Sequence, residues 1–261
     1  MASLEMVSIE ALGQDSNGFY TIDTNECIYT VNNDAKINIK SGAFARIIDQ
    51  SKNSNILVNV LDGATLEYYL VNGNSNHSFH VYGELRITEI SLDATNENLE
   101  VVLEKENAVT DVKNLSVLAK EKSYYTQKII HNDKQTFSNI TNVGVAIGGA
   151  SITFDTTGKI EKGKSKSKCA QLSRGIVMDN DSVIVAKPIL LIDEYDCFAN
   201  HGASIGKMSD EDLFYLMSRG LTKNEAFLLI LEGIIRPFIN AIPQDEIKES
   251  LDNQINSRMH E

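Results

Sequence analysis

Short β segments return along most of this chain at intervals close to twenty residues. Turns that precede apolar alternations begin at Gly42, Gly63, Gly83, Asn107 and Gly149, and the intervals between them are 21, 20, 24 and 42 residues, the last being twice 21. A repeat of this length is typical of a β-solenoid, in which each coil packs only on its neighbours. A β-sandwich would instead show turns about every 8 to 12 residues without a fixed long period. The rhythm therefore predicts a mainly β chain that folds as a parallel β-helix.

The region from Phe19 to Ile205 contains β-branched and alternating runs and no convincing helical period. Proline is absent before Pro188, as expected if most strands are central and use every backbone donor. If the rhythm is a coil repeat, inward-facing residues of successive coils stack in layers. The residues that we assign to these layers are Leu66, Leu85, Val102 and Ile152.

The period becomes helical after Ser209, which caps a short helix that ends near Gly220. Thr222-Lys223-Asn224-Glu225 is a capping box that opens a longer helix. The face of that helix predicted to be buried consists of Ala226, Phe227, Leu229, Ile230, Gly233, Ile234 and Phe238. The last segment has a narrow apolar stripe of Ile247, Leu251 and Ile255. We therefore predict a β-helix core over 1–205 and a small C-terminal helical domain over 206–261.

Composition is that of a folded protein, with 42% apolar and 23% charged residues. No apolar run is long enough to span a membrane, and Met1 to Glu10 lacks the features of a secretory signal, so we expect a cytoplasmic protein. A net charge of -12 argues against binding nucleic acid or an anionic membrane. A local exception is a run of lysines, which an extended backbone would place on one solvated strand face: Lys159, Lys162, Lys164, Lys166 and Lys168.

The three cysteines, Cys27, Cys169 and Cys197, are widely spaced and odd in number, so they predict no disulfide framework. The chain also has no Cys-x-x-Cys pair and no His-x-x-x-His pair. It therefore shows no complete ligand set for a metal cluster, and a cluster role would need ligands from another subunit. We interpret Cys27 and Cys169 as core or incidental residues.

The segment from Cys197 to Gly206 places His201 between small residues and leads into Leu213-Phe214-Tyr215-Leu216-Met217-Ser218-Arg219-Gly220. This order resembles the C-terminal signature of the SufB/SufD family of iron-sulfur cluster assembly proteins, in particular its SufD branch. Shorter matches upstream include Gln171 with Arg174, Ile176 to Asp179, and Pro188 to Leu190, although Leu191 replaces the family's glutamate. The resemblance covers roughly Ile130 to Arg258.

The resemblance implies a right-handed β-helix and a non-catalytic scaffold subunit. It implies a SufB-type partner at the β-helix edges, a SufC-type ABC ATPase at the C-terminal helices, and a transient iron-sulfur cluster in the complex, with no cofactor held tightly by the isolated chain. Compared with longer relatives, we expect the chain to lack an N-terminal helical domain. The residues expected to contact the ATPase are Leu213, Phe214, Tyr215, Arg219 and Phe227.

His201 is the main candidate ligand, because the resemblance places it at the cluster site and imidazole is a borderline ligand for iron. The alternative is a structural histidine that ends a strand. Ala199 stands where the family often has cysteine, and the nearest thiol is that of Cys197. On a strand, an offset of four would place Cys197 on the same face as His201. Cys197 as a second ligand and Cys197 as a buried structural thiol both remain open.

Two other functions remain open. A homodimeric SufB-like scaffold, or a homodimer of the isolated chain, would use the same fold, but Gly202 stands where SufB-like chains have glutamate. A solenoid binding module or a polysaccharide enzyme would use clustered acids, of which Asp193, Glu194 and Asp196 form the dense group near the site. Tryptophan is absent and no aromatic platform accompanies these acids. No Walker A, Rossmann or Gly-x-Ser-x-Gly motif occurs.

Overall fold

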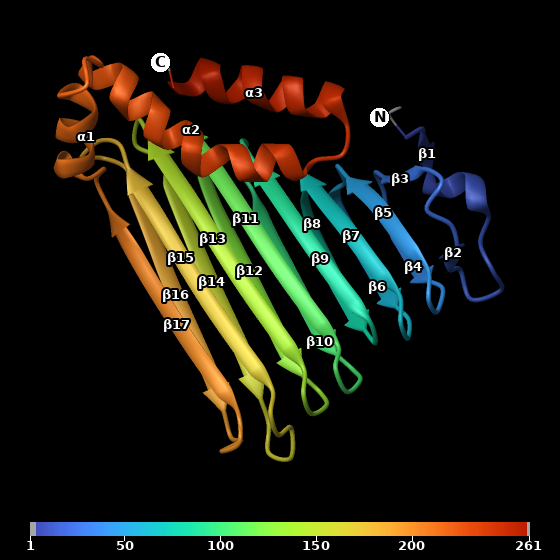
Figure 1. The fold of residues 1–261 in the computed structure, drawn as a ribbon. Helices are drawn as coiled ribbons and strands as arrows, with labels where there is room; N and C mark the ends of the chain where they lie inside the picture. The colour runs from blue at the N-terminus through green and yellow to red at the C-terminus, as the bar shows by residue number, and fades with distance from the viewer. Residues whose placement is uncertain (1–3, 260–261) are drawn as a thin grey trace.

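The computed structural model describes residues 4–259 and shows two parallel β-sheets that run side by side (Figure 1). Odd-numbered strands form a nine-stranded sheet in the order β1-β3-β5-β7-β9-β11-β13-β15-β17, and even-numbered strands form an eight-stranded sheet from β16 to β2. Because consecutive strands alternate between the sheets, each coil gives one strand to each. The predicted parallel β-helix is confirmed.

The strands lengthen along the chain. Their bounds are Met6–Ser8 (β1), Tyr20–Ile22 (β2), Ile28–Val31 (β3), Ala35–Ile39 (β4), Phe44–Asp49 (β5), Lys52–Val60 (β6), Thr65–Val71 (β7), Asn74–Val81 (β8), Glu84–Ser91 (β9), Asn96–Leu103 (β10), Val109–Ala119 (β11), Lys122–His131 (β12), Phe137–Ile147 (β13), Ser151–Ile160 (β14), Lys168–Val177 (β15), Val183–Ile192 (β16) and Phe198–Gly206 (β17). A short 3₁₀ helix, Ile9–Leu12, follows β1.

The twenty-residue rhythm describes only the early coils. Phe44 pairs with Thr65, 21 residues further on, whereas Phe137 pairs with Lys168, 31 residues further on. The first four predicted turns do precede odd-numbered strands, but Gly149 lies in the turn before β14, at the opposite end of the coil. The interval of 42 residues is therefore not two coils, and that part of the prediction was wrong.

The interior is built as layers of inward-facing side chains. Leu66 and Leu85 are neighbours in the register of β7 and β9 and are fully buried, as is Ile152 on β14. Val102 is only half-buried, while Val101 and Leu103 on either side of it are fully buried. The assignment of Val102 to the interior was therefore wrong by one residue, and in a strand that error changes the face.

The lysine run does not form a strand face. Lys159 is the penultimate residue of β14, Lys162 to Lys166 lie in the turn before β15, and Lys168 begins β15. Lys164 donates to the Asn132 carbonyl, and Lys159 pairs with Glu161. The expectation of one extended basic face was therefore wrong.

Three helices follow the last strand: Asp210–Met217 (α1), Lys223–Ala241 (α2) and Asp245–Met259 (α3). Both predicted N-caps are present, since the Ser209 hydroxyl accepts from the Asp212 amide and Thr222 forms a complete capping box with Glu225. The predicted buried face of α2 is partly wrong, because Leu229 and Gly233 are exposed. The residues of α2 that are buried are Ala226, Leu231, Ile235, Phe238 and Ile239.

Helices α2 and α3 lie across the C-terminal ends of the odd-numbered strands (Figure 1). There Leu231 and Leu251 join one apolar cluster with outward-facing strand residues such as Ile90 and Leu115. The predicted stripe on α3 is confirmed at Leu251 and Ile255, which are buried. The division of the chain at 205/206 stays a prediction. In the described part of the chain, no helix is both long and apolar enough to cross a membrane.

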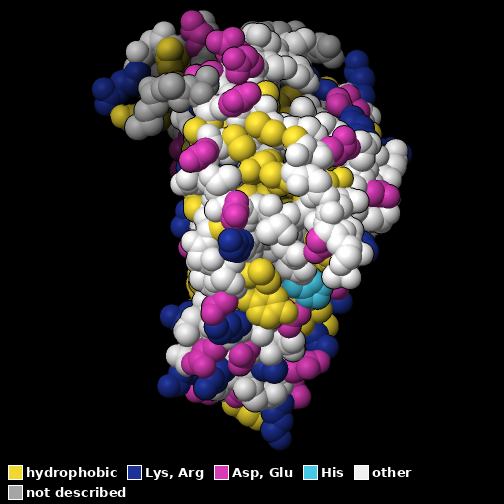
Figure 2. Space-filling model, turned by 90° about the vertical axis from the view of Figure 1, so that its right-hand side faces the viewer, with side chains coloured by type: hydrophobic (Ala, Val, Ile, Leu, Met, Phe, Trp, Pro, Cys, Tyr) yellow, Lys and Arg dark blue, Asp and Glu magenta, His cyan; other side chains and the backbone are white. Residues whose placement is uncertain are grey.

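Figure 2 faces the end of the solenoid formed by the first coils, where hydrophobic side chains lie among acidic and basic ones. Met6 and Leu12 are exposed hydrophobic residues of this N-terminal region. Apolar surface is therefore present at the first coils as well as at the last coil described below.

Candidate functional site at the open end of the solenoid

The last coil is an open end of the solenoid. β16 and β17 are the final strands of their sheets, and each pairs with one neighbouring strand in the described part of the chain. Edge strands carry backbone donors and acceptors that are free to pair with another chain. Large hydrophobic side chains are also exposed on the last coils: Leu172, Val183, Ile189, Leu191, Tyr195, Phe198 and Ile205.

His201 lies in the middle of β17 and its side chain is exposed. Its register neighbour on β15 is Gln171, which is buried, and Ala199 is likewise the neighbour of buried Cys169. Neighbouring residues in a parallel sheet point to the same face. The His201 side chain is therefore on the inner face of the coil, and it is exposed because no further coil covers it.

Cys197 lies in the turn before β17, so the two-residue period of a strand does not extend to it. Its thiol donates to the Glu194 carbonyl at 3.1 Å and is partly buried. Burial, with the nearby charges of Glu194 and Asp196, raises the pKa of this thiol, which disfavours the thiolate that binds metals. Among the described residues, no group of three or more His, Cys, Asp and Glu side chains is arranged to hold a metal ion.

The acidic group beside the site shapes a turn. The Glu194 carboxylate accepts from the backbone amides of Gly163, Tyr195 and Asp196. These bonds lower the pKa of Glu194. A carboxylate committed to backbone donors with a lowered pKa is poorly suited to act as a general acid. This geometry disfavours carbohydrate cleavage by these acids.

Helix α1 presents an exposed aromatic surface, which we call the α1 surface and define as Phe214, Tyr215 and Arg219. Phe214 is 73% and Tyr215 58% exposed, and the Arg219 guanidinium lies over the Tyr215 ring at 5.2 Å. Of the other residues predicted to contact the ATPase, Leu213 is buried and Phe227 packs half-buried against the helix–sheet cluster. Those two hold the helices in place and offer little surface for direct contact.

A buried charged cluster in the early coils is the strongest electrostatic feature of the core. His77 lies between Asp49, at 2.9 Å from Nε2, and Glu97, at 3.3 Å from Nδ1. Although burial alone would lower the pKa of His77, its hydrogen bond to Asp49 and the nearby Glu97 carboxylate raise that pKa to about 9. Burial and the neighbouring Glu97 raise the pKa of the Glu89 carboxyl well above its ordinary value.

Sequence analysis missed this cluster. The available signal was the alternation in Asn74–Val81, where His77 occupies a position of the inward-facing parity together with Phe79 and Val81. A histidine at such a position requires buried partners, because an unpaired buried polar group is costly. The partners come from coils 20 or more residues away, and only the folded register brings them together.

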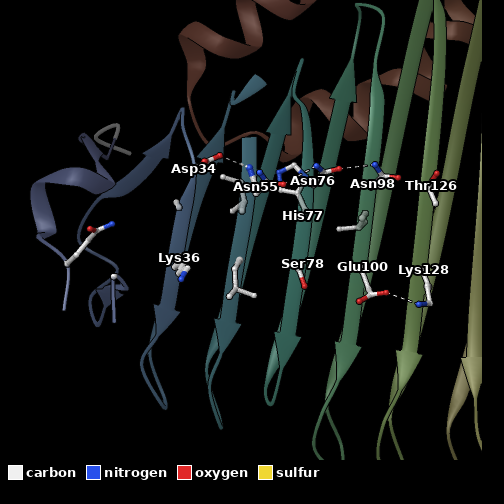
Figure 3. A pocket seen from close by; sticks show the side chains of 16 residues that line it. Asp34, Lys36, Asn55, Asn76, His77, Ser78, Asn98, Glu100, Thr126 and Lys128 are labelled. Atoms are coloured by element: carbon white, nitrogen blue, oxygen red, sulfur yellow. Dashed lines mark hydrogen bonds and ion pairs between the residues drawn. The ribbon is translucent and has the colours of Figure 1, made fainter. Parts of the chain in front are cut away.

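A groove of about 860 Å³ lies over the outer face of β4 to β12, distant along the solenoid from β17 (Figure 3). Its side chains mainly satisfy one another. Asn98 donates to Asn76 and Asn76 to Asn55, while Lys128 pairs with Glu100. No Phe, Tyr or Trp side chain lines the groove. The site at β17 is separate from this groove, and the groove lacks the aromatic platform of a sugar-binding surface.

A parallel β-helix with open end coils and helices packed over its strand ends defines the structural class of this protein. Over residues 13–234 the sequence matches the family described as SUF system FeS cluster assembly, SufBD core domain, and the chain belongs to this family. The resemblance inferred from the C-terminal motif is therefore confirmed.

Individual relatives share about half of the chain. The iron-sulfur cluster assembly protein SufD of Bacillus subtilis (strain 168) is 41% identical over 127 residues, 49% of this chain and 29% of the relative. SufB of the same organism is 33% identical over 122 residues, 45% of this chain and 25% of the relative. An iron-sulfur cluster assembly SufBD family protein of Mycobacterium tuberculosis (strain ATCC 25618 / H37Rv) is 32% identical over 118 residues, 45% of this chain and 14% of the relative. The chain thus spans less than a third of these relatives' lengths.

Proposed function

We propose that this protein is a non-catalytic, SufD-like scaffold subunit for iron-sulfur cluster assembly, and that its last coil pairs with a SufB-type subunit. The observation that carries the proposal is the exposed His201 on the inner face of an unpaired end coil. The higher identity to a SufD than to a SufB, 41% against 33%, supports the SufD-like assignment.

The pairing surface follows from backbone chemistry. Strand addition at β16 and β17 would give their unpaired backbone groups hydrogen-bond partners and would cover exposed apolar side chains such as Leu191 and Phe198. His201 would then lie at the junction of two chains, where the partner supplies further ligands. A single imidazole cannot hold a cluster, so a nascent cluster would be transient cargo shared by both subunits. A second copy of this chain is the competing occupant of the same edge.

The α1 surface suits a second partner, a SufC-type ABC ATPase. Exposed aromatic side chains with an adjacent arginine are the residue types enriched in protein interfaces. α1 is separated from the edge strand by only a short connection, Lys207 to Ser209. ATP-driven movement of the bound ATPase would thus act directly beside the cluster-binding coil.

We expect His201→Ala to lower the iron and sulfide recovered with an anaerobically purified complex of this chain with SufB-type and SufC-type subunits. The side chain is exposed, so the variant should still fold and should still form the complex. Cys197→Ser should have a smaller effect, because that thiol is bonded to a turn carbonyl. Iron and sulfide at the wild-type level in the His201→Ala complex would refute the ligand assignment, and copurification of a homodimer without a SufB-type subunit would favour the competing occupant.

The double variant Phe214→Ala/Tyr215→Ala should weaken capture of the SufC-type subunit at least about tenfold, because buried aromatic anchors dominate interface energies. Point changes are preferable to deleting the helices, since α2 and α3 cover apolar strand residues that deletion would expose. The matched control is Tyr195→Ala, which removes an aromatic ring that is 98% exposed on a turn remote from α1. Equal affinities of the double variant and wild type in a titration would remove α1 from the ATPase interface.

A further inference from the structure

Gln171 is buried directly beside the candidate ligand. It is 5% exposed, it lies on β15, and its register neighbours are Ile140 on β13 and His201 on β17. All three side chains share the inner face of the nine-stranded sheet. We propose that Gln171 is a positioning residue that accepts a hydrogen bond from the His201 ring at Nδ1 and so leaves Nε2 free to face a ligand at the open end.

The orientation of the Gln171 amide is fixed from one side. Its Nε2 donates to the Ile189 carbonyl of β16 at 3.2 Å, and a carbonyl can only accept, so the nitrogen must face β16. The oxygen of the same amide, Oε1, is buried and has no hydrogen-bond partner among the described residues. A buried acceptor that stays unpaired has lost its hydration without compensation, which favours a bond to a donor within reach.

The two register neighbours of Gln171 differ in whether they can donate to that oxygen. Ile140, the neighbour of Gln171 on one side, is apolar and cannot donate. His201, the neighbour on the other side, has ring nitrogens without a partner in the described structure and is free to rotate because it is exposed. Gly158 provides the space for the buried amide, since a Cβ there would lie 3.0 Å from Gln171 Nε2 and 2.4 Å from Cys169 Sγ.

The chemical consequence concerns the tautomer of His201. A neutral imidazole donates through one nitrogen and accepts or ligates through the other, and the partner of the first decides which is which. A free histidine ring in water prefers the proton on Nε2. A bond from Nδ1–H to Gln171 would reverse that preference and point the Nε2 lone pair outward. The tautomer is a property of this chain alone, whereas its use as a ligand rests on the proposed function.

The test is ¹⁵N NMR of the His201 ring in the isolated full chain. In wild type the Nδ1–H tautomer should predominate, and Gln171→Leu, which keeps the bulk but has no acceptor, should shift the ring to the ordinary Nε2–H preference. Gln171→Met, which is unbranched like glutamine and also lacks an acceptor oxygen, should shift the ring in the same way. The control is Asn200→Leu, which changes an exposed amide next to His201 in sequence but on the other face of β17, and it should leave the tautomer unchanged.

The outcomes separate this inference from the proposed function. The same tautomer ratio in wild type, Gln171→Leu and Gln171→Met overturns the positioning role whether or not the complex carries iron. A changed tautomer with wild-type iron in the His201→Ala complex supports the positioning role and removes the ligand role. If both hold, Gln171→Leu should lower the iron and sulfide of the complex. If Gln171→Leu does not fold, the tautomer ratio in Gln171→Met decides the question.

Discussion

Replacing His77 with alanine is expected to lower the free energy of unfolding by about 3–5 kcal/mol, because the change removes one member of a buried ion pair and leaves charge behind. The side chains of His77 and Asp49 are fully buried and that of Glu97 is 3% exposed. Burial alone would raise the pKa of Asp49, yet the bond from His77 and further bonds from Tyr68 and Ser51 lower it, so this carboxyl is ionised in the folded protein. Without His77, Asp49 and Glu97 would have no cation beside them.

The loss of unfolding free energy in His77→Ala should depend on pH, and the pKa of His77 gives the direction of that dependence. The pKa of His77 rises from an ordinary 6.5 to about 9 on folding, so the folded state binds the proton more tightly. Its stabilising contribution is therefore complete below about pH 6.5 and is lost as the pH rises through 9. The difference in unfolding free energy between wild type and His77→Ala should shrink over that window, as measured by urea denaturation at each pH.

The control for His77 lies on the same strand. His80 faces outward from β8 and bonds Glu104 at 2.7 Å, with 37% of its side chain exposed. His80→Ala should change stability by no more than about 1 kcal/mol, because exposed pairs contribute little. If His77→Ala were as mild as His80→Ala, the buried cluster would not contribute to the stability of the core.

Leu85→Asp is expected to unfold the early coils. Leu85 is fully buried among core atoms, and its register neighbours are Leu66 and Thr110. A carboxylate there would lose its hydration without gaining a cation, and the cost of several kcal/mol is comparable to the whole stability of a domain of about 5–15 kcal/mol. Circular dichroism during thermal unfolding should show loss of the cooperative transition.

The matched control for Leu85→Asp is Val102→Asp. Val102 is also an apolar strand residue, but it points away from the interior and is only half-buried. Its replacement should therefore be tolerated with a much smaller loss of stability. A folded Leu85→Asp protein with a wild-type midpoint would contradict the stacking of inner layers, and equal damage from both variants would contradict the observed register of β10.

Features in which a residue type has a single local structural role could be predicted best from the sequence. The caps at Ser209 and Thr222 were predictable because a hydroxyl before a helix satisfies a backbone amide at short range. His201 could be placed on a late strand for a similar reason, since small residues and glycine surround it in a recognisable order. Coil lengths in the later part were not predictable, because strands of β11 to β15 lengthen without a periodic signal at their turns.

The sequence by itself determined the parallel β-helix, the helical C-terminal segment and the family, because period, capping residues and an ordered motif are local properties of the chain. Only the tertiary structure decided which strand face is inside, that Cys197 belongs to a turn, and that Gln171 neighbours His201. It also brought His77 to Asp49 and Glu97. These relations depend on the register between coils, where a shift of one residue exchanges inside for outside, and register is set by the packing of residues far apart in sequence.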